Sequence, residues 1–283
     1  MTKKIKTIVD LRDELIETRK LKKKISLVPT MGNIHEGHLS LIKNAQNQSD
    51  YVVVSLFVNP TQFVAGEDFN EYPHTLDSDI ELISKLNVNL VFIPEAIELY
   101  PMNNKISTEV SIPELESIYC GKHRPGHFRG VATIVSKLFN IVQPDIAIFG
   151  EKDYQQLLII RSLVRNLFLP IEIISLPTVR EASGLAMSSR NNYLTEPERQ
   201  KAPMLYECIK TTVNSIINGV KDYEKLEKEA KLFLQEAGFK IEYYNICDSE
   251  TLGPVQGKTL VVLAAVWLGK TRLIDNATAH TYD

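Results

Sequence analysis

The sequence predicts an α/β fold, because short β-branched runs alternate with segments of helical periodicity over its first 178 residues. The valines of Tyr51–Phe57 follow one another directly, which is typical of a parallel strand covered on both faces. A chain of 283 residues, 44% of them hydrophobic, can form one large domain and a smaller one. We therefore expect a parallel sheet with helices on both faces, followed by a smaller α+β unit.

The elements of the predicted sheet follow in order along the chain. Strands are expected at Ile25–Pro29, Tyr51–Phe57, Leu90–Ile93, Asp145–Phe149 and Ile171–Leu176. Helices are expected from about Ile34 onward and at Thr75–Leu86, Gly130–Val142 and Asp153–Asn166. Asp153 stands at the position of a helix cap.

From about Thr178 the pattern changes to a polar loop followed by a different order of elements. Helices are expected at Pro197–Gly219 and Tyr223–Gly238, and strands at Ile241–Cys247, Leu260–Leu268 and near Arg272–Asn276. We place the boundary near Val179, which gives a larger domain at residues 1–178 and a smaller one at 179–283.

Composition argues against several classes of partner. The formal net charge is −3, without a long Lys/Arg block, so no electrostatic footprint for nucleic acid is expected. The longest apolar run, Leu260–Leu268, is too short to span a bilayer, and Met1–Arg12 lacks the apolar run of a signal peptide. The three cysteines form no CxxC pair, which favours a reducing compartment. We expect a cytoplasmic protein without membrane or nucleic-acid partners.

The most informative stretch runs from Pro29 to His38 and joins the first predicted strand to a helix. The start of a helix offers unpaired N–H groups and a partial positive charge, both of which favour phosphate. His35 and His38 lie three residues apart on one face, and Gly37 lets a nucleotide approach the backbone. Two surface histidines or a metal site remain alternatives, although no third metal ligand lies nearby. His-x-Gly-His after a strand and a Thr-Met-Gly turn resembles the signature of the nucleotidylyltransferase superfamily.

That resemblance implies a second phosphate-binding loop later in the chain. The candidate is Met187–Arg190, where two hydroxyls and a guanidinium could hold phosphate oxygens. Taken alone, Ser-Ser-Arg is a common polar loop. Its occurrence together with the histidine loop favours the phosphate-binding interpretation.

Longer motifs narrow the class to one family. They are Phe57–Phe63, Arg124–Thr133, Phe149–Gln156, Gly184–Asn191 and Gly269–Asn276. In this order, and over essentially the whole chain, the sequence resembles the pantothenate synthetases (pantoate–β-alanine ligases). The resemblance implies a Rossmann-like N-terminal domain, a smaller C-terminal lid and a homodimer. It also implies ATP as a substrate with Mg²⁺, and pantoate and β-alanine as the other substrates.

The resemblance further implies roles for individual residues. ATP would be bound by Met31, Gly32, Asn33, Ile34, His35, Glu36, Gly37, His38, Gly150, Glu151, Lys152, Asp153, Val179, Met187, Ser188, Ser189 and Arg190. Pantoate would be bound by Gln62 and Gln156, and β-alanine also by Gln62. The residues implied in catalysis are His38 as the proton donor, together with His35, Lys152 and Arg190.

Two positions depart from the family pattern, and two other functions stay open at this point. His74 replaces an arginine after Tyr72-Pro73, and Ser183 replaces an acidic residue. Another nucleotidylyltransferase would share both loops but need no site for an amine. A non-catalytic nucleotide-binding protein would also have this fold, although His38, Lys152 and Arg190 are all present. A tRNA synthetase is disfavoured by the near-neutral charge.

Overall fold

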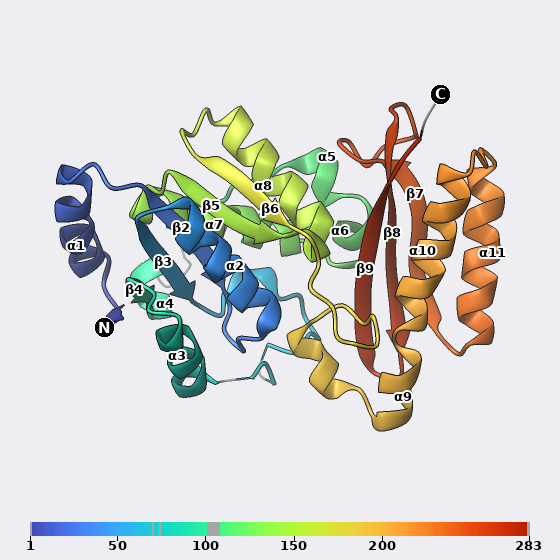
Figure 1. Ribbon diagram of the computed structural model, residues 1–283, viewed down its shortest axis with the longest axis horizontal. Coiled ribbons are helices and arrows are strands. Elements are labelled where there is room, and N and C mark those ends of the chain that lie inside the picture. Colours follow the sequence, from blue (N-terminus) through green and yellow to red (C-terminus); the bar gives the residue numbers. More distant parts are fainter. Residues whose placement is uncertain (1, 70, 74, 101–107, 282–283) are drawn as a thin grey trace. The chain divides into compact units, whose positions relative to one another are not determined.

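The computed structural model describes residues 2–69, 71–73, 75–100 and 108–281, and Figure 1 shows their helices and strands. Packing divides the chain into two compact units. Unit 1 comprises Met1–Glu151 and Gln156–Pro177, and unit 2 comprises Lys152–Gln155 and Thr178–Asp283. The sequence did not predict that Lys152–Gln155 would group with the C-terminal unit. His74 lies outside the described residues.

Within the described ranges, six parallel strands form the sheet of unit 1 in the order β1-β4-β3-β2-β5-β6. Their bounds are Lys3–Ile5 (β1), Ile25–Thr30 (β2), Tyr51–Leu56 (β3), Leu90–Phe92 (β4), Ile146–Gly150 (β5) and Glu172–Leu176 (β6). The predicted α/β class is thus confirmed, and β2 to β6 lie where the sequence predicts strands. The edge strand β1 was not predicted, because it has only three residues, two of them lysines.

Helices of unit 1 connect these strands (Figure 1). They are α1 (Ile8–Lys20), α2 (Glu36–Gln48), α3 (Leu76–Lys85), α4 (Ala96–Leu99), α5 (Pro113–Glu116), α6 (Tyr119–His123), α7 (His127–Val142) and α8 (Tyr154–Asn166, whose first residues belong to unit 2). Crossovers between parallel strands are right-handed. Given the strand order, this handedness puts α2 and α3 on one face of the sheet and α1, α7 and α8 on the other.

The core of unit 1 explains why these segments adopt their structures. Every residue of β3 is buried, as expected for a strand covered on both faces. Val28, Val54 and Ile148 pack against Ile42 of α2 and Ile83 of α3 in one cluster. Helix α7 is buried at most positions, which matches its nearly continuous apolar sequence.

Helix α1 shows why the N-terminal region was not predicted as structured. It buries only Leu11, Leu15 and Thr18 and exposes many charged residues, so its apolar stripe is narrow. The Thr7 hydroxyl caps the helix by accepting a hydrogen bond from the N–H of Asp10 at 3.1 Å. The segment is therefore a capped surface helix.

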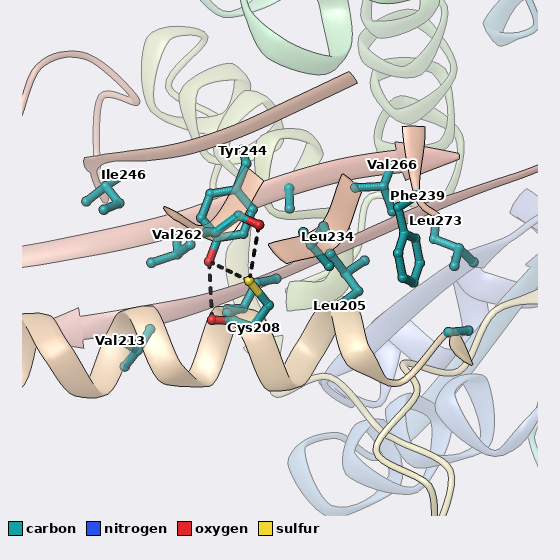
Figure 2. Close-up of a cluster of buried hydrophobic side chains, with 14 of the residues drawn as sticks. Leu205, Cys208, Val213, Leu234, Phe239, Tyr244, Ile246, Val262, Val266 and Leu273 are labelled. Atoms are coloured by element: carbon teal, nitrogen blue, oxygen red, sulfur yellow. Dashed lines mark hydrogen bonds between the residues drawn. The ribbon is translucent and has the colours of Figure 1, made fainter. Parts of the chain in front are cut away.

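Unit 2 contains an antiparallel sheet in the order β7-β8-β9 within its described residues, with helices packed on one face. The elements are α9 (Glu196–Lys201), α10 (Met204–Ile217), α11 (Tyr223–Glu236), β7 (Lys240–Asp248), β8 (Thr259–Leu268) and β9 (Thr271–His280). Figure 2 shows the buried cluster between α10, α11 and the sheet. In it, the hydroxyl of Tyr244 lies 2.7 Å from the Thr212 hydroxyl, so its polar atom is paired.

The predicted helix Pro197–Gly219 is in fact two helices, and this prediction was wrong at their junction. Helix α9 ends at Lys201 and α10 begins at Met204. Pro203 stands between them, where its missing N–H and its ring disfavour a continuous helix.

Candidate active site

The strand order points to a candidate binding site at the carboxyl ends of β2 and β5. Strands β2 and β5 are neighbours, and successive connections depart from them in opposite directions along the sheet. In open α/β sheets, ligands bind at this kind of switch point, outside the carboxyl ends of the strands. The loop from Met31 to His35 follows β2, and Gly150 ends β5, so two predicted ATP-binding segments begin at this edge of unit 1.

A buried carboxylate holds the loop after β2. Both oxygens of Asp79 accept backbone hydrogen bonds, from Asn33 at 2.9 Å and from Ile34 at 2.8 Å. Gly32 has a φ of +83°, and a Cβ there would lie 2.8 Å from Asp79 Oδ2. Glycine is therefore required by both the backbone conformation and the available space. Asp79 was not among the predicted residues, because it lies 45 residues from Ile34 in the sequence.

His35 and His38 form a reciprocal cap at the start of α2. The Nδ1 of His35 accepts a hydrogen bond from Gly37 N–H at 3.1 Å, and the Nδ1 of His38 accepts one from His35 N–H at 3.4 Å. Their ring centroids are 4.0 Å apart at an interplanar angle of 30°. A ring nitrogen that accepts a hydrogen bond carries no proton, so each neutral ring has its proton on Nε2. The two side chains are thus held together as Nε2–H tautomers.

Gln62 lies next to this loop. It ends the short η1 helix (Pro60–Gln62) after β3, and its side chain is buried. Its Nε2 lies 2.7 Å from Met31 Sδ, and its Oε1 accepts a hydrogen bond from Asn59 at 3.1 Å. Asn59 is itself fixed by the Tyr100 hydroxyl, which donates to its Oδ1 at 2.7 Å. The structure therefore brings Met31 and Gln62 together and adds Asn59 and Tyr100 as supports that the sequence did not predict.

Helix α7 supports the backbone of Gln62. A Cβ on Gly130 would lie only 2.3 Å from the carbonyl oxygen of Thr61, so only glycine permits this approach. The Nδ1–H of His127 donates to the carbonyl of Gln62 at 2.6 Å, while Arg124 donates to His127 Nε2 at 2.9 Å. These contacts set the position of η1 on unit 1.

Arg124 also forms a two-pronged ion pair with Glu67. Burial of Glu67 by itself raises its pKa. The hydrogen bonds and charge of Arg124 outweigh burial and bring the pKa of Glu67 below its ordinary value. Both partners are therefore charged at neutral pH, and the pair anchors the start of α7 to the loop after Gln62.

The turn after β5 contains the next group of predicted residues. Glu151 accepts a hydrogen bond from the Ser175 hydroxyl at 2.8 Å within unit 1. Lys152 and Asp153 follow in a 3-10 turn and belong to unit 2, while Gln156 lies in the third position of α8 and belongs to unit 1. Asp153 directly precedes α8, at the position where the sequence predicts a cap. The predicted ATP-binding and pantoate-binding residues are therefore divided between the units.

The second predicted phosphate loop is a tight structure within unit 2. The N–H of Met187 donates to the carbonyl of Val179 at 2.9 Å, and Gly184 turns the chain with a φ of +94°. Ser188 caps the 3-10 helix η3 (Ser189–Tyr193) by accepting from Arg190 N–H at 3.3 Å. The loop thus brings Val179, Met187, Ser188, Ser189 and Arg190 into one segment. Ser183, the second departure from the family pattern, is exposed in the turn between Arg180 and Ala186.

Asn191 and Glu181 hold this loop in place through hydrogen bonds, and neither was a predicted site residue. Asn191 is buried and donates to the carbonyl of Ala186 at 3.0 Å and to Glu181 at 3.1 Å. Arg199 from α9 donates to both oxygens of Glu181. Asn191 lies directly after the Ser-Ser-Arg motif, and this position is the feature of the sequence that could have indicated its role in the loop.

Across the described ranges, no three His, Cys, Asp or Glu side chains are grouped as metal ligands would be. None of the helices with described coordinates is long and apolar enough to cross a membrane.

The parallel sheet, with paired histidines after β2 and a serine-arginine loop later in the chain, fits the nucleotidylyltransferase type of fold. A family model described as pantoate-beta-alanine ligase matches residues 3–278. The chain belongs to the pantoate–β-alanine ligase family.

Individual relatives agree with this assignment. The pantothenate synthetase of Hahella chejuensis is 50% identical over 278 residues, which cover 98% of each chain. The crystal structure of pantothenate synthetase from Thermus thermophilus matches with a TM-score of 0.91 and 39% identity, over 98% of this chain and 99% of that one. A pantoate-beta-alanine ligase from Francisella tularensis, complexed with beta-gamma ATP and beta-alanine, matches with a TM-score of 0.79 and 36% identity, over 98% and 97% of the two chains.

Proposed function

We propose that this protein condenses pantoate with β-alanine at the expense of ATP, giving pantothenate, AMP and pyrophosphate through a pantoyl-adenylate intermediate. The observation that best supports the chemistry is the pair of Nε2–H histidines at the start of α2, at the switch point of the sheet. The Francisella tularensis relative, solved with an ATP species and β-alanine, supports the choice of substrates.

In the first half-reaction, a carboxylate oxygen of pantoate attacks the α-phosphorus of ATP, and the bond from that phosphorus to the bridging oxygen of pyrophosphate breaks. Pantoate is already ionised at neutral pH, so no base is needed to generate the nucleophile. The protein has to position the reactants and neutralise charge on the phosphates. Nε2–H groups of His35 and His38 would donate to phosphate oxygens, and the N–H groups and dipole of α2 would add to this effect.

Unit 2 would supply the remaining positive charge. We assign Lys152 and Arg190 to the phosphates, with Ser188 and Ser189 as hydroxyl donors. We assign the backbone of Val179 to the adenine and Gly150, Glu151 and Asp153 to the rest of the nucleotide. These assignments follow the family resemblance.

In the second half-reaction, the amine of β-alanine attacks the acyl carbon of the anhydride, AMP leaves with the electrons of the acyl–oxygen bond, and the new amide nitrogen releases a proton to solvent. We assign Gln62 and Gln156 to pantoate, because amide side chains both donate to and accept from its hydroxyl and carboxylate groups. Gln62 is suited to this role, since Asn59 and the η1 backbone already fix it beside Met31. The same residue would contact β-alanine.

Magnesium fits this site as a companion of ATP. Mg²⁺ usually keeps several water ligands and binds substrate phosphates, so it needs no dedicated protein cage. Asp79 is the buried carboxylate beside the histidine loop. Both of its oxygens already accept hydrogen bonds from the backbone N–H groups of Asn33 and Ile34. When bound, Mg²⁺ would neutralise the triphosphate and stabilise the departing pyrophosphate.

Pyrophosphate–ATP exchange tests the proposal directly. The purified protein is assayed with Mg²⁺, with and without pantoate, and AMP release is then followed on adding β-alanine. We expect exchange only when pantoate and Mg²⁺ are both present, and AMP release only when β-alanine is added. Folded, ATP-binding protein that shows no exchange with pantoate would contradict the ligase function. Adenylated product without AMP release would favour a nucleotidylyltransferase that lacks an amine acceptor.

The assembly and location of the protein are further parts of the proposal. We propose a cytoplasmic homodimer whose C-terminal unit closes on ATP binding and keeps water from the labile acyl-adenylate. Small-angle scattering should give the mass of a dimer and a change of shape when ATP and pantoate are added. A monomeric mass would contradict the homodimer. Identical scattering curves with and without ligands would contradict closure of the C-terminal unit. Cell fractionation checks the compartment.

A further inference from the structure

Two neighbouring residues on β9, Asp275 and Asn276, contact both segments of unit 2 that contain predicted ATP-binding residues. Adjacent residues of a strand point to opposite faces of the sheet. Asp275 lies on the face of Leu273 and Ala279, which pack in the cluster with α10 and α11. Asn276 lies on the other face. Both side chains are buried, and neither was a predicted site residue.

Asp275 holds Arg180, which lies at the beginning of the Val179–Arg190 loop. Its two carboxylate oxygens accept hydrogen bonds from Arg180 at 2.6 and 2.9 Å. The guanidinium of Arg180 also lies over the ring of Tyr206, 3.2 Å from the ring centroid, and donates to the carbonyl of Gly184 at 3.2 Å. Arg180 is therefore fixed by three different groups, and it directly follows Val179 in the sequence.

Asn276 holds the turn that contains Lys152. Its Nδ2 donates to the carbonyl of Lys152 at 2.9 Å, across 124 residues of sequence. The Tyr154 hydroxyl makes a second attachment by donating to the carbonyl of Ser249 at 2.9 Å. These contacts give a physical reason why Lys152–Gln155 groups with unit 2 rather than with its sequence neighbours.

The two contacts are also coupled to each other. The backbone N–H of Asn276 donates to Oδ1 of Asp275 at 2.8 Å, so the same carboxylate oxygen receives both this bond and one from Arg180. Low-dielectric surroundings strengthen such charge-assisted bonds, and loss of one partner leaves a buried polar group unpaired. A change at either residue would therefore displace a segment rather than only remove a surface contact.

We propose that Asp275 and Asn276 are positioning residues, which fix Lys152 and the Val179–Arg190 loop relative to one another for binding ATP. The inference rests on the proposed function, because that function assigns both segments to the nucleotide. Neither residue touches substrate in this role. Asp275 acts through Arg180 and the loop, and Asn276 acts through the backbone of Lys152.

The test uses Asn276→Leu and Asp275→Asn in the full-length chain. Leucine has a similar size to asparagine but donates no hydrogen bond, and asparagine at 275 removes the charge with little change of shape. We expect both variants to raise the KM for ATP and the calorimetric Kd for ATP on the order of tenfold. The KM for pantoate should change less than about twofold, because the assigned pantoate residues lie in unit 1.

Glu242→Gln is a matched control on the same sheet. Glu242 forms a largely buried two-pronged ion pair with Arg272 of β9, with exposed side-chain fractions of 9% and 14% against 3% and 16% for Asp275 and Arg180. This control removes a comparable charge and should lower the thermal midpoint without changing the KM for ATP. All kinetics are measured well below the lowest midpoint. If Asp275→Asn does not fold, Asn276→Leu provides the test, because it leaves no buried charge unpaired.

The possible outcomes separate this inference from the proposed function. An ATP-specific defect in the β9 variants that is absent from Glu242→Gln supports the inference. The inference is overturned if the KM and Kd for ATP and the KM for pantoate change no more in the β9 variants than in Glu242→Gln. In that case, pantoate-dependent exchange by the wild type still supports the ligase function. If the wild type binds ATP without exchange, the ligase function fails, and the calorimetric ATP affinities still decide the inference. A wild type that binds no ATP overturns both.

Discussion

Replacement of His38 by alanine is expected to slow the adenylation of pantoate on the order of 10²-fold, or about 2.7 kcal/mol of transition-state stabilisation. The reason is that Nδ1 is already used to cap α2, so the ring has its Nε2–H to offer to developing negative charge on the phosphates. Single-turnover formation of pantoyl-adenylate, followed by rapid quench, measures the step directly. Thermal unfolding of the variant should show a loss of about 1 kcal/mol from the missing cap.

Two further variants at this position separate capping from phosphate binding. Asparagine places a polar atom near the position of Nδ1 and can keep the cap, but it does not reach the position of Nε2. Glutamine reaches the position of Nε2 and can donate there, but it loses the cap. If the Nε2–H is the group that matters, His38→Asn should be as slow as His38→Ala, and His38→Gln should be faster than both. A His38→Asn variant with wild-type rates would show that His38 acts only as a helix cap.

The fold was largely predictable because its central strands are unusual in composition. Strands β2, β3 and β5 are almost wholly buried, so their apolar residues run consecutively and mark them clearly. Strand β1 and helix α1 were missed because a three-residue edge strand and a narrow apolar stripe leave no such pattern. The junction between α9 and α10 was missed although Pro203 marks it, because the charged sequence of α9 has no apolar pattern of its own that would separate it from α10.

The candidate site residues were predicted from short motifs and from the family resemblance that these motifs support. His35 and His38 stand three residues apart, and Ser188 and Arg190 lie within one turn, so each pair falls within one such motif. The residues that hold these candidate segments in place lie far from them in the sequence. Asp79 holds a backbone 45 residues away, and Asn276 holds one 124 residues away. A single sequence gives no indication of such pairs, since each looks like an ordinary polar residue in a helix or a strand.

Replacement of Lys152 by alanine is expected to slow adenylation by a similar factor, on the order of 10². The backbone at Lys152 is held by Asn276 and by neighbouring contacts of the same turn, so removal of the side chain should leave its place in unit 2 unchanged. Lys152→Met keeps an unbranched apolar chain but no charge, and it should be as slow as the alanine variant. Lys231→Met in α11 makes the same change at a lysine paired with Glu227, and it should keep wild-type rates.

The two half-reactions should respond differently to the loss of Lys152. Before adenylation the site contains a triphosphate, whose charge the lysine would help to neutralise. After pyrophosphate has left, only the single phosphate of the acyl-adenylate remains, so the lysine has less charge to stabilise during attack by β-alanine. AMP release from preformed intermediate should therefore slow much less than adenylation in Lys152→Ala. Equal slowing of both steps would indicate a general disturbance of the site, whereas wild-type rates in both would remove Lys152 from the mechanism.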